Sequence, residues 1–196
     1  MKRVIVPEPR KIRMEEVPLP KRNPGEALLK VRYVGICGSD LHTYRGTSPL
    51  VTYPVVPGHE LSCEVIEADE KFSPGDWVVV EPLLSCGSCY PCRVGRYNCC
   101  ENLRVLGVQT SGGMAEEIAL PLKMLHRLPD GADPSFAPLV EMLSIGYHAC
   151  DRGRIERGDN VLVIGAGPIG LGPKQARMER QITAGAGEPK NRAKLL

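Results

Sequence analysis

Four side chains with the chemistry of a catalytic metal site occur within six positions of this 196-residue chain. They are the thiol of Cys37, the hydroxyl of Ser39, the carboxylate of Asp40 and the imidazole of His42. Thiolate, imidazole and carboxylate groups are the ligands of catalytic zinc, which keeps one coordination position open for water or substrate. Because a lone cysteine is usually a small buried hydrophobe, it is the grouping that predicts a metal site.

Three residues further along the chain could complete this site. His59 and Glu60 follow Cys37 by about twenty residues, and Glu141 lies much further on. Each of them alone would be read as an ordinary polar residue. They indicate a metal site only in combination with residues 37–42. Together they predict that distant segments meet around one divalent cation, bound through thiolate, imidazole and carboxylate groups.

The element that must position Cys37 is a predicted strand over residues 26–34. Apolar Leu29, Val31 and Tyr33 alternate there with charged residues, which is the period of a half-buried strand. We expect this strand to deliver Cys37 to its end, where a ligand can face a cleft.

A cysteine-rich loop indicates a second metal site. Cys86, Cys89 and Cys92 have Cys-x-x-Cys spacing, and Cys100 follows with Cys99 beside it. Four thiolates in such a loop fit a closed tetrahedral structural zinc site, whose binding energy can order a loop with few apolar residues. A ferredoxin-type iron–sulfur run would continue with three residues and Cys-Pro, and a redox Cys-x-x-Cys pair would leave the other cysteines unexplained. We therefore predict zinc, with Cys100 in preference to Cys99 as the fourth ligand.

A glycine-rich turn suggests a nucleotide site. The apolar residues 161–164, read as a buried strand, run into Gly165, Gly167 and Gly170 in the pattern Gly-x-Gly-x-x-Gly. In this fingerprint the first glycine allows a tight turn, the second lets pyrophosphate approach, and the third allows close packing of helix and strand. Glu188 stands about where an acidic residue would bind the ribose hydroxyls of NAD.

The surrounding elements suggest two domains. Short apolar runs separated by many of the 21 glycines and 18 prolines predict a turn-rich, mainly β first part. Asp133 and Pro134 then resemble the start of a helix that runs to about residue 150. We place the boundary in the charged stretch that follows, between a domain over residues 1–153 and another over residues 154–196.

Composition excludes several classes of function. A hydrophobic content of 42% and a charged content of 24% are typical of a globular protein. The net charge of +2 provides no strong field for nucleic acid. The uncharged run over residues 161–173 is too short and too rich in glycine to span a membrane. No cleavable leader precedes the first strand, and the cysteine spacing fits metal ligation, so we expect a cytoplasmic protein.

Taken in order, these motifs resemble the zinc-dependent alcohol dehydrogenases of the medium-chain dehydrogenase/reductase family. The likeness is greatest to the branch of sorbitol-like polyol and threonine dehydrogenases, and it covers residues 26–170. It implies a mainly β GroES-like catalytic domain followed by the start of an α/β Rossmann domain. It also implies catalytic and structural zinc, NAD or NADP as cofactor, and a small-molecule alcohol as substrate.

The resemblance assigns the metal ligands. Cys37 and His59 would bind the catalytic zinc, and Glu60 and Glu141 would each be a ligand or lie next to one. Met142 stands where the family usually has proline, directly after this last carboxylate. Cys86, Cys89, Cys92 and Cys100 would hold the structural zinc.

The resemblance also assigns the proton chemistry. Asp40 would fix the tautomer and ring orientation of His59. Ser39 would take the proton of the alcohol, and His42 would pass it toward solvent. Cys63 stands where the family usually has glycine, so we expect a local change of backbone near the catalytic site.

The end of the chain departs from the family pattern. Gly172 and Pro173 fall in the first turns of the expected crossover helix, and residues 184–187 are not an apolar strand. The chain therefore resembles a C-terminally truncated relative, whose open sheet edges would favour homo-oligomers. Two other interpretations are a non-catalytic zinc-binding remnant without a nucleotide site, and a zinc-ribbon interaction module built on residues 86–100.

Overall fold

The computed structural model describes residues 1–69, 71–156, 159–165, 167–172 and 193–195. Contacts within the chain group it into two units, Met1–Pro138 and Leu139–Leu196, which are described separately below. The domain boundary that we place after residue 153 stays a prediction. Among the described residues, no helix combines the length and the apolar character needed to cross a bilayer.

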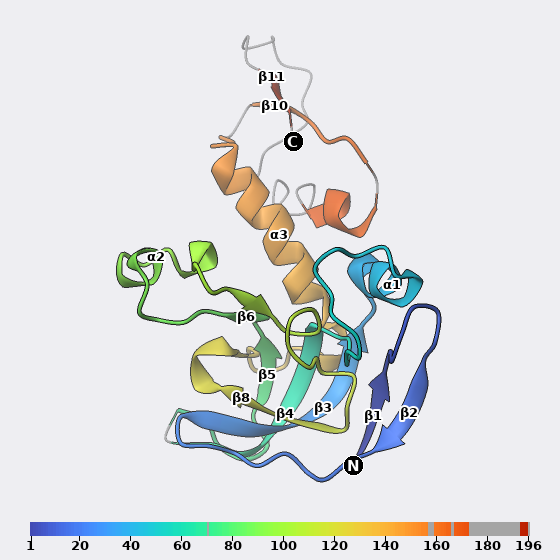
Figure 1. Ribbon diagram of the computed structural model, residues 1–196. Coiled ribbons are helices and arrows are strands. Elements are labelled where there is room, and N and C mark those ends of the chain that lie inside the picture. Colours follow the sequence, from blue (N-terminus) through green and yellow to red (C-terminus); the bar gives the residue numbers. More distant parts are fainter. Residues whose placement is uncertain (70, 157–158, 166, 173–192, 196) are drawn as a thin grey trace. The chain divides into compact units, whose positions relative to one another are not determined.

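The first unit is built on a five-stranded antiparallel sheet in the order β8–β3–β4–β5–β9 (Figure 1). The longest of these strands, β3, has ten residues and pairs with both β4 and β8. The predicted strand over residues 26–34 is therefore present. The bounds are Glu26–Gly35 for β3, Glu60–Glu67 for β4, Trp77–Val80 for β5, Glu117–Pro121 for β8 and Leu125–Arg127 for β9.

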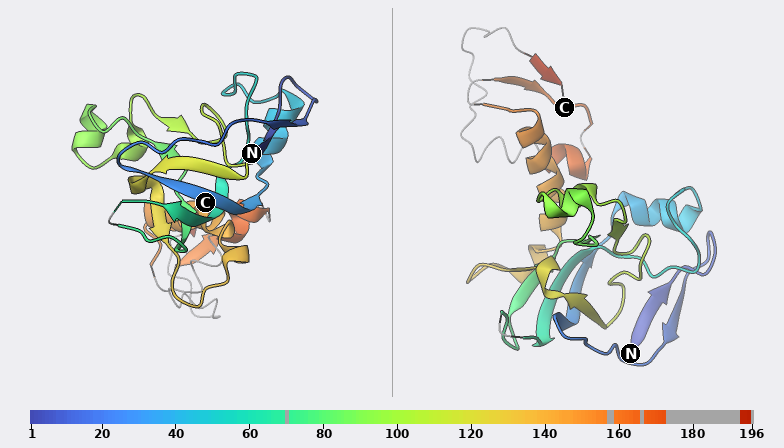
Figure 2. Two further views of the ribbon diagram at one scale, coloured as in Figure 1. Left: turned by 90° about the horizontal axis from the view of Figure 1, so that it is seen from below. Right: turned by 60° about the vertical axis from the view of Figure 1, so that its left-hand side comes forward.

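Short elements surround this sheet. Helix α1 and the loop that carries α2 lie toward the same end of the sheet in the different views (Figures 1 and 2). Two small hairpins, β1–β2 and β6–β7, complete the unit. The bounds are Lys2–Ile5 for β1, Arg13–Glu16 for β2, Gly38–Arg45 for α1, Leu83–Leu84 for β6, Tyr90–Arg93 for α2, Tyr97–Cys99 for the 3₁₀ turn η1, Arg104–Val105 for β7, Leu122–Met124 for η2 and Pro134–Phe136 for η3.

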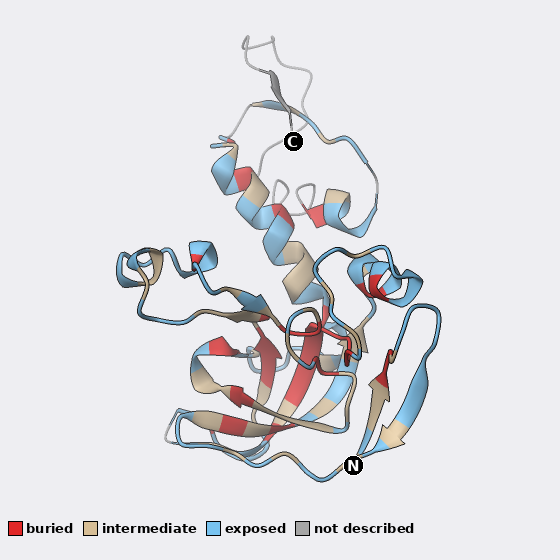
Figure 3. Cartoon of the chain, in the orientation of Figure 1, coloured by how far each residue is buried: buried red, intermediate tan, exposed pale blue. Residues whose placement is uncertain are grey.

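The side chains of the hydrophobic core come mostly from this sheet, and β3, β4 and β5 contribute most of the buried positions (Figure 3). Cys63 belongs to this core: it is fully buried in β4, opposite Val31 and Val78 of the neighbouring strands. Burial raises the pKa of its thiol to about 12. The cysteine that replaces the family's glycine thus acts as a core residue of β4, next to a register shift in its pairing with β3.

One detail of the predicted strand pattern is wrong. We expected Tyr33 on the same face as Leu29 and Val31, but Tyr33 is 44% exposed and stacks on Trp77, with 6.4 Å between ring centroids. The register of β3 against β4 shifts between Val31 and Tyr33, as at a β-bulge. Because a bulge adds one residue, it reverses the faces beyond it, and Val34 packs against the core instead.

The second unit contains α3 (Leu139–Arg152) and a parallel pair of strands, β10 (Asn160–Leu162) and β11 (Ala193–Leu195). Residues 168–172 are helical. A strand is thus present at 160–162, but the prediction that residues 161–164 form a buried strand is wrong, because Leu162 is 58% and Ile164 is 70% exposed. Residues 173–192, which include Glu188, Pro173 and the glycine-rich stretch 184–187, lie outside the described part of the chain.

The helix of this unit begins later than the sequence indicates. Asp133 accepts a hydrogen bond from the backbone N–H of Ser135 at 2.9 Å, so it caps the 3₁₀ turn η3. The α-helix itself starts at Leu139. The Asp-Pro signal was read correctly as a helical start, but the element that it begins is a single 3₁₀ turn.

Candidate metal centres

Strand pairing brings Cys37, His59 and Glu60 together in the first unit. Gly35, the last residue of β3, lies opposite Glu60, the first residue of β4, and Cys37 follows β3 as the N-cap of α1. One possible ligand atom from each of the three residues lies within 4.8 Å of the others. We call Cys37, His59 and Glu60 the three-ligand cluster.

Two members of the three-ligand cluster are buried, and Cys37 is half-buried. His59 is 6% exposed and Glu60 is 9% exposed. Burial raises the pKa of the Glu60 carboxyl above its ordinary value, and the charge of Asp40 acts in the same direction, against His59 and a hydrogen bond with Cys37. A cation at this place would instead favour the ionised carboxylate.

Asp40 holds the framework of the cluster from the first turn of α1. Its carboxylate accepts hydrogen bonds from the backbone N–H of Cys37 at 2.9 Å and of Gly58 at 3.3 Å. The same carboxylate lies 3.8 Å from Nδ1 of His59, a buried atom that has no hydrogen-bond partner. If the carboxylate moved closer to the ring, it would accept a hydrogen bond from Nδ1–H of His59 and leave Nε2 to bind a metal. Carboxylates commonly orient histidine ligands in this way.

These observations fit zinc. The cluster offers one sulfur, one nitrogen and one oxygen donor, which leaves a fourth tetrahedral position for a further ligand. The orphaned ring nitrogen of His59 next to Asp40 is the partner arrangement that a metal-bound imidazole requires.

A glycine ledge, Gly112 and Gly113, holds the backbone before His59. Backbone N–H groups of residues 112–114 donate to carbonyls of residues 56–58 at 2.7–3.0 Å. A Cβ atom on Gly112 would lie 2.4 Å from the carbonyl oxygen of Gly58, too close for any side chain. Sequence reasoning missed this ledge, although the adjacent glycines were a visible signal.

The two residues assigned to proton transfer lie one turn apart on α1, and both are exposed. Ser39 Oγ lies 3.5 Å from Nε2 of His59, at the edge of the three-ligand cluster. His42 Nδ1 lies 2.8 Å from Oγ1 of Thr47, which also donates to the His42 carbonyl at 3.4 Å. Sequence reasoning did not single out Thr47, because only the turn that ends α1 at Gly46 brings it back to His42.

Glu141 belongs to the second unit, where it lies in the first turn of α3. The hydroxyl of Ser144 donates to its backbone carbonyl at 2.6 Å. The role of Glu141 as a metal ligand stays a prediction.

The cysteine loop forms a second cluster. One sulfur from each of Cys86, Cys89, Cys92 and Cys100 lies within 4.8 Å of the others, whereas the exposed Cys99 is not a member. The sulfur of Cys89 lies 3.4 Å from that of Cys92 and 3.8 Å from that of Cys100. A tetrahedron with zinc–sulfur bonds of about 2.3 Å has sulfur–sulfur edges of roughly 3.8 Å. The spacing therefore fits one central ion and leaves no room for an iron–sulfur cluster.

Backbone groups direct their hydrogens at these sulfurs. The N–H groups of Cys86 and Asn102 both donate to Cys100 Sγ at 3.3 Å, and the N–H of Cys89 donates to Cys86 Sγ at 3.4 Å. The last of these bonds is the largest cause that lowers the pKa of Cys86 to about 5. Burial is the main cause that raises the pKa of Cys92 to about 12. A metal would remove this contrast, since coordinated thiols are deprotonated.

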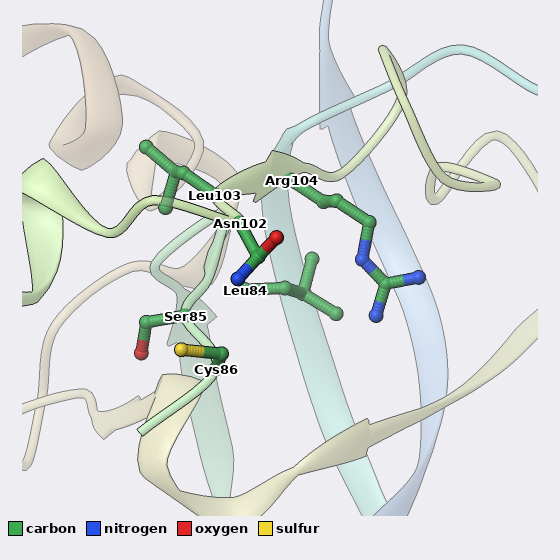
Figure 4. A pocket seen from close by; sticks show the side chains of 6 residues that line it. All are labelled: Leu84, Ser85, Cys86, Asn102, Leu103 and Arg104. Carbon is green, nitrogen blue, oxygen red and sulfur yellow. The ribbon is translucent and has the colours of Figure 1, made fainter. Parts of the chain in front are cut away.

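A cavity of about 410 Å³ lies at the base of this loop, beside the paired strands β6 and β7. Figure 4 shows Cys86 and Arg104 on its wall, with the guanidinium group of Arg104 directed away from the cysteine. This arginine therefore does not pair with the thiol of Cys86. The residues lining the cavity are Leu84, Ser85, Cys86, Asn102, Leu103 and Arg104.

In the second unit, the glycines of the predicted nucleotide turn show two of the expected features. Gly165 has a φ of 102°, which favours glycine. A Cβ atom on Gly170 would lie 2.0 Å from the carbonyl oxygen of Gly165, so this glycine permits the helical residues 168–172 to approach the strand end. A Cβ atom on Gly167 would meet no described atom within 4 Å.

Comparison with known proteins places the chain in a family. The alcohol dehydrogenase GroES-like domain matches residues 23–130, which include the three-ligand cluster and the four-cysteine loop. The chain belongs to this family. Membership confirms the expected fold class, because the first unit of this GroES-like chain is mainly β sheet.

Relatives of this GroES-like chain include a named dehydrogenase and a dehydrogenase-like protein. It is 44% identical over 175 residues to an uncharacterized zinc-type alcohol dehydrogenase-like protein of Haemophilus influenzae, which covers 87% of this chain and 51% of the relative. It is 41% identical over 162 residues to a sorbitol dehydrogenase of Halalkalibacterium halodurans, covering 81% and 47%. The chain thus spans about half the length of these relatives.

A solved alcohol dehydrogenase structure has the same fold over most of this chain. The alcohol dehydrogenase RspB of Escherichia coli, in complex with NADH, superposes with a TM-score of 0.84 at 38% identity, over 90% of this chain and 52% of that one.

Proposed function

We propose that the protein is a zinc-dependent oxidoreductase that transfers hydride from a secondary alcohol of the polyol or amino-alcohol type to NAD or NADP. The observation that carries this proposal is the three-ligand cluster, with its mixed sulfur, nitrogen and oxygen donors beside Ser39. The relatives support it, since one of them is a sorbitol dehydrogenase and RspB binds NADH.

The residues at the cluster would have two roles, as metal ligands and as the group that orients one ligand. Cys37, His59 and Glu60 would bind zinc, and Asp40 would hold the Nδ1 proton of His59, so that Nε2 faces the ion. When bound, zinc supplies Lewis acidity that lowers the pKa of an alcohol hydroxyl.

The proton released by the alcohol would leave along α1. Ser39 Oγ, next to the cluster, would accept it, and the exposed imidazole of His42 would carry it to solvent. The hydrogen bond between His42 Nδ1 and Thr47 holds that ring in one orientation, which leaves Nε2 for the transferred proton.

The two remaining sites would be structural and cofactor-binding. Cys86, Cys89, Cys92 and Cys100 would bind a second zinc ion that orders their loop. The turn with Gly165, Gly167 and Gly170 would bind the pyrophosphate of the nucleotide at the N-terminus of the following helix.

The proposal is tested with the purified chain loaded with zinc. We expect NADH to form when the chain is given NAD together with sorbitol, xylitol, threonine or butanediol, and NADH to bind in a fluorescence titration. Two zinc ions per chain without NADH binding or turnover would instead show a non-catalytic zinc-binding protein.

We expect the substitution Thr47→Val to alter proton transfer without removing metal. His42 would lose the partner of Nδ1, so its ring nitrogens should show a changed tautomer ratio by nitrogen NMR. Turnover should fall by roughly tenfold, as part of the contribution of a general base is lost, and its pH profile should shift.

The exposed Thr52, on the loop that follows α1, provides the control. Thr52→Val should leave both the tautomer ratio and the pH profile as they are. If Thr47→Val behaves in the same way, Thr47 does not orient His42.

A further inference from the structure

We propose that Gly35 is a positioning residue, whose missing side chain makes the space in which the Glu60 carboxylate reaches the metal. This inference rests on the proposed function of the three-ligand cluster as a zinc site. It adds a residue that binds nothing itself and acts on the metal through its neighbour.

The contact between Gly35 and Glu60 follows from the strand register. Gly35 lies directly opposite Glu60 in the pairing of β3 with β4. A Cβ atom on Gly35 would lie 2.1 Å from Glu60 Oε2, 2.9 Å from its Cβ and 3.1 Å from its Cδ. The carboxylate of Glu60 thus lies over the backbone of Gly35, in space that any other residue would fill.

The backbone at Gly35 does not itself demand glycine. Gly35 is not among the glycines with positive φ, in contrast to Gly58 with a φ of 98°. An alanine could therefore adopt the same backbone conformation. The three atoms nearest to its methyl group would all belong to the side chain of Glu60. The effect of a substitution should consequently pass through the side chain of Glu60, both its Cβ atom and its carboxylate.

Displacing the carboxylate would remove the only oxygen donor of the three-ligand cluster. Because Glu60 is 9% exposed and its strand neighbours are buried, the side chain has little room to settle elsewhere. Cys37 and His59 would keep their places, since α1 and the glycine ledge hold them. We expect metal affinity at the cluster to fall by about 10- to 100-fold, as when a supporting residue of a metal site is removed.

Cobalt titration of the purified chain tests this inference with a double-mutant cycle. Gly35→Ala should weaken cobalt binding at the three-ligand cluster and change the visible absorption of the bound ion. Glu60→Gly, which removes the carboxylate together with the Cβ atom that lies 2.9 Å from the added methyl group, should do the same, and Gly35→Ala combined with Glu60→Gly should bind cobalt no more weakly than Glu60→Gly alone. Additive losses would overturn the inference, because Gly35 would then act independently of the carboxylate.

Gly38 supplies the matched control in the same segment. It has no described atom within 4 Å of an added Cβ and no positive φ, so Gly38→Ala should bind cobalt like the parent chain. Equal cobalt affinity in Gly35→Ala and Gly38→Ala would overturn the inference. Circular dichroism of each variant reports whether the five-stranded sheet is folded, and cobalt–thiolate absorption reports separately on the four-cysteine loop.

Two further results have a clear meaning. If Gly35→Ala alone does not fold, a folded double variant supports the contact with Glu60, and an unfolded one overturns it. Failure of the proposed function is recognised separately: Cys37→Ala and His59→Ala would then leave cobalt binding unchanged, whatever the behaviour of Gly35.

Discussion

Replacing Cys100 with serine should reduce the zinc content of the chain from about two ions to one and unfold the loop over residues 86–100. Cys100 is the buried member of its cluster and accepts hydrogen bonds from the backbone N–H groups of Cys86 and Asn102. Most of the loop is exposed, so it has few apolar contacts to keep it folded. Zinc binding by such peptides contributes on the order of 10 kcal/mol, which nothing else in the loop can replace.

The neighbouring Cys99 gives a control one position away. It is exposed and lies outside the cluster, so Cys99→Ser should retain the full zinc content. Elemental analysis gives the zinc count, and limited proteolysis shows whether cleavage is confined to the loop. The five-stranded sheet should survive in both variants, because its core lies elsewhere. Equal zinc content in Cys100→Ser and Cys99→Ser would refute the assignment of the fourth ligand.

Replacing His59 with alanine should remove the other zinc ion and abolish dehydrogenase activity. The substitution deletes the only nitrogen donor of the three-ligand cluster and leaves Asp40 without the ring that its carboxylate faces at 3.8 Å. Loss of a supporting residue alone weakens metal binding by about 10- to 100-fold, so loss of a ligand should cost about 100-fold or more. Competition with a chromophoric chelator measures this affinity.

His126 provides the corresponding control. This exposed histidine of β9 lies 3.4 Å from Glu81 and belongs to neither cluster. His126→Ala should therefore retain both zinc ions and the activity. Should His59→Ala hold its second zinc ion as tightly as His126→Ala does, the three-ligand cluster is not the metal site.

Motifs that are local in the chain were predicted well. The four-cysteine loop could be recognised because its ligands lie within fifteen residues and one turn sets most of their spacing. The strand over residues 26–34 followed from its alternating pattern, and the bulge that turns Tyr33 outward did not. A bulge is decided by pairing with another strand, which a pattern within one strand does not record.

The sequence does not decide whether the chain forms a 3₁₀ turn or an α-helix after Asp133, so the start of α3 could not be predicted. Asp133 and Pro134 favour a helical start, but the chain makes one 3₁₀ turn there before α3 begins at Leu139. The assignments of Glu141 as a metal ligand and of the glycine-rich turn as a nucleotide site stay predictions, and Glu188 lies outside the described residues.

The sequence by itself determined which donors this protein offers: the types and order of Cys37, His59, Glu60 and the loop cysteines already indicated two zinc sites. Only the tertiary structure decided how these donors are held. The register of β3 with β4 places Glu60 over Gly35, and the return of the chain after α1 places Thr47 against His42. Such contacts join residues through strand pairing and turns, and their distances depend on the packing of the whole unit and not on any local pattern.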